Sequence, residues 1–221
     1  LSWDASKPNL PAVTSRPYRP ISYVSWPDAL AYAAWAALRP ITELEFEKAC
    51  RGTAAAVADE YAWGSTNITQ ATGITNSGAG SETASNSGAN CAYGGHASVQ
   101  GPMRVGCFAT SSSTRETSGA TYYGIMEMSG NLRKICVTIG NSDGRSFTGS
   151  HGDGALDSTG NANASSWPEP SDNFDLSGAG FRGGGWFTDA TLARVSDREY
   201  AQGPVLSRYF TSEFRCVRLA P

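Results

Sequence analysis

Two short stretches near the end of the chain, FRGGGW at residues 181–186 and FRCVR at residues 214–218, are its most informative sequence. Glycine permits close approach of the backbone, and buried aromatic side chains anchor a fold, so both stretches predict a rigid frame. The segment between them is rich in Tyr, Phe, Thr, Ser and Asp, which are residue types of adaptable binding surfaces. This contrast indicates a recognition surface carried by a fixed scaffold.

The candidate ligand-binding residues lie between these two stretches and are expected to be exposed. Tyr209 and Phe210 could instead belong to the core, since aromatic side chains bury a large area. We favour exposure because their neighbours lack a buried periodicity and Phe214 supplies a core anchor. The candidate set is Phe187, Thr188, Asp189, Thr191, Leu192, Tyr200, Tyr209, Phe210, Thr211 and Ser212.

The composition predicts one domain, residues 1–221, with extensive loops. A chain of 221 residues that is 40% hydrophobic can bury one substantial core without requiring a second. Its 25 glycines and 11 prolines favour turns over regular elements. Because the chain begins at Leu1 rather than Met, we expect upstream residues to have been removed or left out.

The formal net charge of −3 gives no electrostatic reason to expect nucleic acid or an anionic membrane as a partner. No apolar run approaches the length needed to cross a bilayer, so no direct membrane insertion is expected. The sequence contains no phosphate-binding or dinucleotide-binding motif and no Ser/His/Asp order, and its two histidines lie far apart. We therefore expect no cofactor, no metal and no catalytic residues. Asp143, Asp153 and Asp157 stay open as hard-metal ligands, although Asp-Gly in a loop is more typical of a turn.

The five cysteines are an odd number without CxxC spacing, so they signal neither a disulfide framework nor a zinc site. Buried free thiols are the default expectation. A bridge between Cys91 and Cys107 stays open as an alternative in an oxidising compartment.

Two helices are predicted near the start of the chain. Ser25 caps the first, whose first turn accepts Pro27 and which runs to about residue 38. Thr42 and Glu45 form a capping-box pattern for the second, which ends before Gly52.

The remaining elements are short strands and loops, which gives an α+β domain with a small twisted antiparallel sheet. The best interior strand is residues 133–139, because Ile135, Val137 and Ile139 alternate on one face. Segments 65–120 and 140–180 are expected to be long loops pinned to the domain. Further strands are expected at residues 21–24, 184–187, about 192–196 and 214–219.

The order of several motifs resembles formylglycine-generating-enzyme-type domains from about residue 21 to the C-terminus. The motifs are YVSWPDA (23–29), RPITELEFEKA (39–49), YAWG (61–64), YGIMEMSGN (123–131), RGGGW (182–186) and FRC (214–216). The resemblance implies a decorated C-type lectin-like fold.

A narrower set of motifs resembles the variable proteins of diversity-generating retroelements. These motifs are RSFTG (145–149), HGDGAL (151–156), GAGFRGG (178–184) and ARVSDR (193–198). The resemblance implies that residues 181–218 form a hypervariable display segment whose protein or surface-receptor ligand changes with the displayed side chains, on a virion or a cell. Randomising both adenines of an Asn codon can yield every candidate residue above, but neither Glu nor Gln. We therefore expect a non-enzymatic binding protein.

Two alternatives stay open beside this interpretation. The first is oxidation of a target cysteine, for which the resemblance implies a cysteine pair in the C-terminal segment that binds a soft metal; Cys216 alone is found there. The second is carbohydrate binding. The resemblance also implies a calcium site after the Gly130-Asn131 turn, which we expect to be lost because Arg133 and Lys134 place cations where an oxygen ligand is needed.

Overall fold

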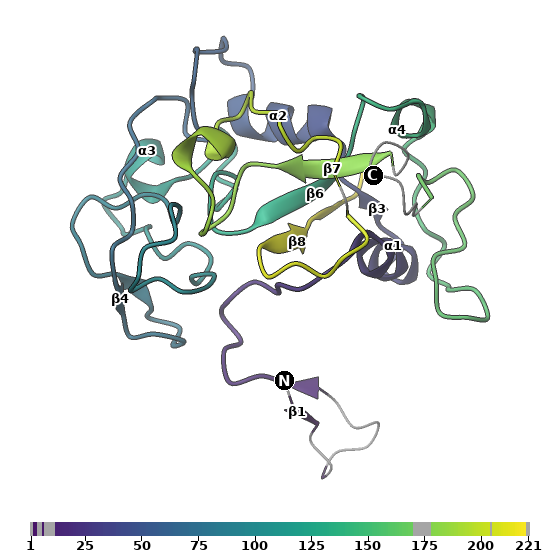
Figure 1. The fold of residues 1–221 in the computed structure, drawn as a ribbon, viewed down its shortest axis with the longest axis horizontal. Coiled ribbons are helices and arrows are strands. Elements are labelled where there is room, and N and C mark those ends of the chain that lie inside the picture. Colours follow the sequence, from purple (N-terminus) through teal and green to yellow (C-terminus); the bar gives the residue numbers. More distant parts are fainter. Residues whose placement is uncertain (1, 4–5, 7–11, 170–177, 204, 220–221) are drawn as a thin grey trace.

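The structure is a computed structural model that describes residues 2–3, 6, 12–169, 178–203 and 205–219. Helices and strands are short and are joined by long loops, as the composition predicts (Figure 1). The helices are α1 Trp26–Trp35, α2 Glu43–Arg51, α3 Arg115–Ser118, α4 Ser142–Ser146 and the 3-10 helix η1 Ala190–Ala193. The strands are β1 Ser2–Trp3, β2 Ala12–Val13, β3 Arg39–Pro40, β4 Ile74–Thr75, β5 Thr83–Ala84, β6 Arg133–Val137, β7 Ala179–Arg182, β8 Ser212–Phe214 and β9 Cys216–Val217.

Both predicted helix starts are confirmed. The Ser25 hydroxyl accepts from the Asp28 amide, and the Asp28 carboxylate accepts from the Ser25 amide. Thr42 and Glu45 form the same reciprocal pair at the start of α2. Such caps satisfy amides that have no partner within the helix. The start of each helix is therefore set by local sequence.

The helix ends agree less well with the prediction. Helix α1 ends at Trp35, before the predicted end, because the chain turns through Ala37 at φ 53° and the Leu38 amide returns to the Ala33 carbonyl at 2.9 Å. Helix α2 ends as expected, since Gly52 at φ 62° leaves the helical path.

The central sheet has the order β7-β6-β8 and lies between the two long helices (Figure 1). Strand β6 pairs antiparallel with β7 and parallel with β8, so the predicted purely antiparallel sheet is wrong in this respect. Ile135 and Val137 pack with α1 in one core cluster, whereas Cys136 packs with Phe46 of α2 in another. Alternate residues of β6 thus serve opposite faces.

Several predicted strands are absent from the described chain. Residues 184–187 form a turn that follows β7, and residues 192–196 fall within η1 and the bend after it. Strand β6 stops at Val137 because the Ile139 amide donates to the Glu43 carboxylate at 2.6 Å instead of to a neighbouring strand. Residues 214–219 split between β8 and β9, and β9 pairs with β3.

The predicted strand at residues 21–24 is wrong as well. Tyr23 has φ 60°, which a strand cannot accommodate. Its amide donates to the Tyr209 carbonyl at 3.0 Å, and Val24 forms an isolated bridge with Tyr209. The N-terminal segment is therefore attached directly to the loop that carries candidate residues.

The loops of residues 65–120 are pinned to the domain as expected. Met103, Cys107 and Phe108 are buried in a core cluster that also contains Leu132 and Trp186. The fully buried Glu82 accepts from the guanidinium of Arg19 and the amide of Arg104, which joins three separate loops. Composition resembling a linker is thus compatible with order when apolar residues are spaced along it.

Candidate ligand-binding face

Four exposed aromatic rings from the connection between β7 and β8 form what we call the aromatic face: Phe187, Tyr200, Tyr209 and Phe210. Phe187 is 58% exposed, and the other three are close to 37%. The rings of Phe187 and Phe210 meet edge to face with centroids 5.7 Å apart. The fold therefore gathers residues that lie more than twenty positions apart in the sequence.

Trp186 is the buried support of this face. Its indole is 7% exposed, and its ring centroid lies 5.6 Å from Phe187 and 5.5 Å from Phe210. Such tilted aromatic pairs are stabilising beyond the area that they bury. The two exposed phenylalanines therefore stand on a common anchor.

A loop from the N-terminal half holds the backbone of the face. The Gly94 amide donates to the Thr188 carbonyl at 2.8 Å, and the Gly95 amide donates to the Trp186 carbonyl at 2.9 Å. Both glycines have positive φ, and a Cβ at Gly95 would lie 3.1 Å from the Phe187 ring. Larger residues at position 95 would disturb this seat.

The predicted binding residues that follow Phe187 differ in their surroundings. Thr188 closes a tight turn, because its hydroxyl accepts from the Gly185 amide at 2.8 Å. Asp189 and Thr191 are exposed, whereas Leu192 is partly buried. Asp189 and Thr191 are thus available to a ligand, and Thr188 also has a structural role.

Thr211 and Ser212 are buried, so their expected exposure is wrong. They are 2% and 0% exposed. Ser212 begins β8 and is paired with Arg133, and the Arg133 amide donates to the Thr211 carbonyl at 2.6 Å. The long-range pairing of β8 with β6 removes both residues from the surface. Ligand contact is therefore limited to the other predicted binding residues.

Arg133 lies under the aromatic face and was not among the predicted binding residues. Its guanidinium carbon lies 4.5 Å from the centroid of Phe181, 5.6 Å from that of Tyr200 and 6.0 Å from that of Tyr209. The signal was present in the strand pattern, since alternation places Arg133 on the same face as Ile135 and Val137. A cation that continues an apolar stripe marks the point where the core meets the surface.

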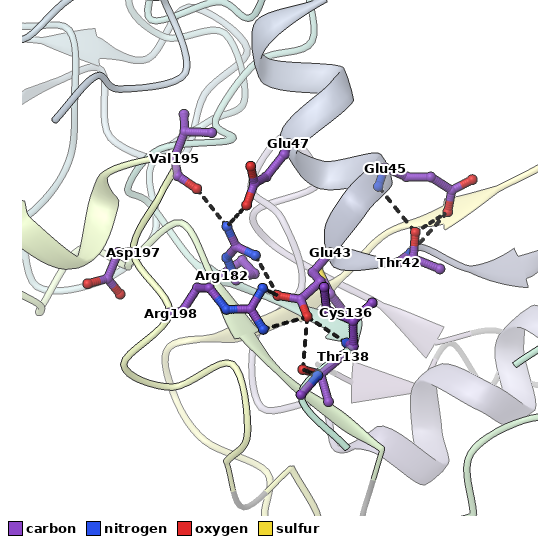
Figure 2. A network of polar contacts seen from close by, with 12 residues as sticks. Thr42, Glu43, Glu45, Glu47, Cys136, Thr138, Arg182, Val195, Asp197 and Arg198 are labelled. Carbon is purple, nitrogen blue, oxygen red and sulfur yellow. Dashed lines mark hydrogen bonds and ion pairs between the residues drawn. The ribbon is translucent and has the colours of Figure 1, made fainter. Parts of the chain in front are cut away.

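A buried ionic network holds the segment that carries Tyr200. Glu43 of α2 accepts from Arg182 at 2.7 Å, from Arg198 at 2.8 Å and from the Thr138 hydroxyl at 3.0 Å (Figure 2). Arg182 also donates to Glu47 at 2.8 Å. Glu43 and Arg182 are almost fully buried, so these charges are paired in a medium that screens them little.

Among the described residues, no hydrogen bond or ion pair joins Asp197 to this network. Asp197 stands apart from it in Figure 2, and its carboxylate accepts from the Glu199 amide at 3.3 Å. Burial raises the pKa of Asp197. The arginines on either side of it use other carboxylates: Arg194 pairs with Asp59 at 3.0 Å, and Arg198 pairs with Glu43. Proximity in sequence did not predict these partners.

The five cysteines are free, so the alternative bridge between Cys91 and Cys107 is not formed. These two thiols belong to different core clusters. Burial raises the pKa of every cysteine, to about 12 for Cys50 and about 11 for Cys216. Cys216 is the partly exposed one, and it lies on β9 beside β3. This arrangement does not fit a pair of C-terminal thiolates that hold a soft metal.

The position expected for a calcium ligand is occupied by an internal cation. The Lys134 ammonium is fully buried and donates to the Gly130 carbonyl at 2.7 Å, with Glu213 at 3.7 Å. Within the described residues, no group of three or more His, Cys, Asp or Glu side chains is placed to hold a metal ion. Over the same residues, no helix has the length and apolar character that a bilayer crossing requires.

The fold and these contacts are accompanied by a clear family relationship. The profile of the family FGE-sulfatase, described as "Sulfatase-modifying factor enzyme 1-like domain", matches residues 1–220. The chain therefore belongs to this family.

Similar proteins carry one name. The chain is 52% identical over 52 residues to a protein named "Formylglycine-generating enzyme" from Streptomyces coelicolor, a match that covers 24% of this chain and 16% of the relative. It is 48% identical over 50 residues to a protein of the same name from Thermomonospora curvata, covering 23% and 16%. A Bos taurus protein of that name is 52% identical over 40 residues, covering 18% and 11%. The matched segments thus span about a sixth or less of these relatives.

These comparisons correct the expectation that the chain is a non-enzymatic protein. The family is an enzyme family, and the similar proteins are named as enzymes. The expected absence of enzymatic function is therefore wrong at the level of the family.

Proposed function

We propose that this member of the formylglycine-generating-enzyme family binds a protein ligand through its aromatic face. The observation that carries the proposal is the gathering of Phe187, Tyr200, Tyr209 and Phe210 into one exposed surface above a buried anchor. Exposed apolar patches of this kind often mark an interaction site. Tyrosine and other aromatic side chains also dominate the energy of protein interfaces.

The support beneath this face suits a surface whose residues change. The amides of Gly94 and Gly95 donate to backbone carbonyls. Glu43 forms ion pairs with Arg182 and Arg198 and does not contact the exposed rings. Replacement of an exposed ring therefore leaves these contacts in place. This is the property that a variable protein of a diversity-generating retroelement requires, and we extend the proposal to that class and to a C-type lectin-like form of the fold.

The binding proposal is tested with the full chain and an array of acetylated, amidated peptides of random sequence. We expect a subset of peptides to bind the wild type and to lose at least tenfold in affinity with Phe187→Ala or Phe210→Ala. Leu44→Ala is the matched control, because Leu44 is 57% exposed but lies on α2. Equal losses for Leu44→Ala and Phe187→Ala, or no bound peptide, would refute the proposal.

The variable-protein class has its own test in the genome. We expect a near-identical copy of the segment encoding residues 181–218 beside a reverse transcriptase, with differences confined to adenines. Natural sequences from one locus should then differ at the exposed positions of the aromatic face and not at Trp186 or Arg182. Differences spread evenly over the chain would contradict the assignment.

A second candidate function is oxidation of a cysteine side chain in a peptide, which the family and the name of its relatives favour. The cysteine arrangement described above offers no C-terminal thiolate pair for this chemistry. Incubation of the chain with copper, oxygen and a cysteine peptide, followed by mass spectrometry of the peptide, decides the question. Conversion that is lost in Cys216→Ser would establish the oxidase.

A further inference from the structure

The Arg133 guanidinium is a partly buried cation without an anionic partner in the described part of the chain. No carboxylate oxygen of those residues lies within 4.0 Å of it. Its neighbours are instead the rings of Phe181, Tyr200 and Tyr209. Burial lowers the pKa of Arg133, which means that its surroundings penalise the charge.

Arg133 also has donors to spare. Its Nε donates to the Thr211 hydroxyl at 3.2 Å, which fixes the orientation of the guanidinium plane. A guanidinium carries five N–H donors, and among the described residues no acceptor is bound by the two Nη groups. Other arginines in this chain behave differently: Arg182 and Arg198 are each paired with Glu43.

A carboxylate is the group that matches this arrangement. The two Nη groups of a guanidinium fit the two oxygens of a carboxylate, and such charge-assisted pairs are stronger than neutral hydrogen bonds. The rings of Tyr200 and Tyr209, whose centroids lie 5.6 and 6.0 Å from the guanidinium carbon, offer an apolar contact beside the cation. One ligand segment can therefore engage a charge and an apolar surface together.

On the basis of the proposed binding function, we propose that the aromatic face selects peptide or protein segments in which a carboxylate, bound by Arg133, lies next to an apolar side chain. Arg133 is on β6 and outside the display segment 181–218, so it is a fixed specificity determinant beneath changeable residues. The ion pair between Arg133 and the ligand carboxylate therefore contributes a similar part of the affinity for every ligand of the aromatic face.

Acidic residues near Arg133 weaken any long-range attraction of acidic ligands, so recognition of the ligand carboxylate depends on direct contact. Asp197 lines the same small depression as Arg133 and Tyr200, and the exposed Asp189 and Glu199 lie on the same segment of chain. The cations of the same segment, Arg194 and Arg198, are each paired with a carboxylate, so charges of both signs surround Arg133. An acidic ligand gains from direct contact with Arg133 and not from long-range attraction, so its association rate should depend weakly on salt.

The test measures binding of three peptide sets to the full chain. The first contains acetylated, amidated random peptides, and in the second each Asp and Glu of the same peptides is replaced by Asn and Gln. A third set carries free C-terminal carboxylates on peptides without Asp or Glu, which separates the two sources of the anion. Affinities are measured for wild type, Arg133→Gln, Arg133→Lys and Phe187→Ala, with near-UV circular dichroism as the check on folding.

We expect the acidic peptides to bind at least tenfold more tightly than their amide counterparts. Arg133→Gln should remove this preference, and Arg133→Lys should retain part of it because Lys keeps the charge but loses the planar fork. Loss of the ligand carboxylate and loss of the Arg133 guanidinium should not add, since both break one contact.

The outcomes separate this inference from the binding function on which it rests. If amide peptides bind as tightly as acidic ones and still require Phe187, the binding function stands and the inference is overturned. If no peptide in any array depends on Phe187, both fail. Because the comparison of acid with amide needs only the wild type, a folding defect of Arg133→Gln does not obscure the result.

Discussion

Arg182 of β7 and Glu43 of α2 are 139 residues apart in sequence, yet their guanidinium and carboxylate groups lie 2.7 Å apart in the core. Glu43 also receives Arg198, so one carboxylate fixes both the sheet and the segment that leads to Tyr200 (Figure 2). The position of the aromatic face therefore depends on a contact that is remote from it.

Glu43→Gln should be strongly destabilising. It leaves two guanidinium groups facing a neutral amide in a buried site, and breaking a buried pair on one side costs about 3–5 kcal/mol. Asp59→Asn is the control, because the Asp59–Arg194 pair is exposed and such pairs contribute roughly 0–1 kcal/mol. Urea unfolding at pH 7 measures both variants, and similar losses for the two would contradict the structural role of Glu43.

Trp186→Ala and Phe187→Ala should have opposite consequences. Truncation of a buried aromatic side chain costs roughly 3–5 kcal/mol, whereas Phe187 loses only its ring contacts, worth about 1 kcal/mol. Thermal unfolding should thus shift far more for Trp186→Ala than for Phe187→Ala, and peptide binding should be lost in Phe187→Ala while the fold persists. Comparable melting temperatures for the two variants would place Trp186 outside the core.

Glu127→Gln should change how stability depends on pH. Burial raises the pKa of Glu127 to about 7 from an ordinary value of 4.5. Between these values the unfolded chain gives up its proton first, so stability contributed by this group falls as pH rises towards 7. The Gln variant keeps an acceptor for the Gly106 amide but carries no charge.

We therefore expect the stability of Glu127→Gln relative to wild type to increase from pH 5 to pH 7.5. Urea midpoints at both values give the comparison. The upper limit stays below the pKa of Lys134, which burial lowers to about 8. A constant difference between the two proteins across this range would show that Glu127 does not titrate there.

Cys216 should be the first thiol to react in the folded chain. It is partly exposed, whereas Cys50, Cys91, Cys107 and Cys136 are buried. Its pKa of about 11 keeps it mostly protonated at pH 8, so the reaction with iodoacetamide should be slow. Peptide mass spectrometry locates the modified residue. Early modification of Cys91 or Cys136 would indicate that the core opens more readily than the structure implies.

The sequence by itself determined the features that depend on neighbouring residues. Ser25 with Asp28 and Thr42 with Glu45 set the helix starts, and Gly52 ends α2. The alternation of Ile135 and Val137 identified the central strand. The abundance of Tyr, Phe, Thr, Ser and Asp between residues 186 and 214 indicated the region of the aromatic face. These signals are readable because each involves residues within a few positions of one another.

The tertiary structure alone decided which residues meet across the fold. Tyr23 leaves the extended conformation to bond Tyr209, and β8 joins β6 in parallel and buries Thr211 and Ser212. Arg182 forms an ion pair with Glu43, and the Arg133 guanidinium packs against aromatic rings instead of a carboxylate. Such pairings depend on the summed energy of many distant contacts, and no local pattern records that sum.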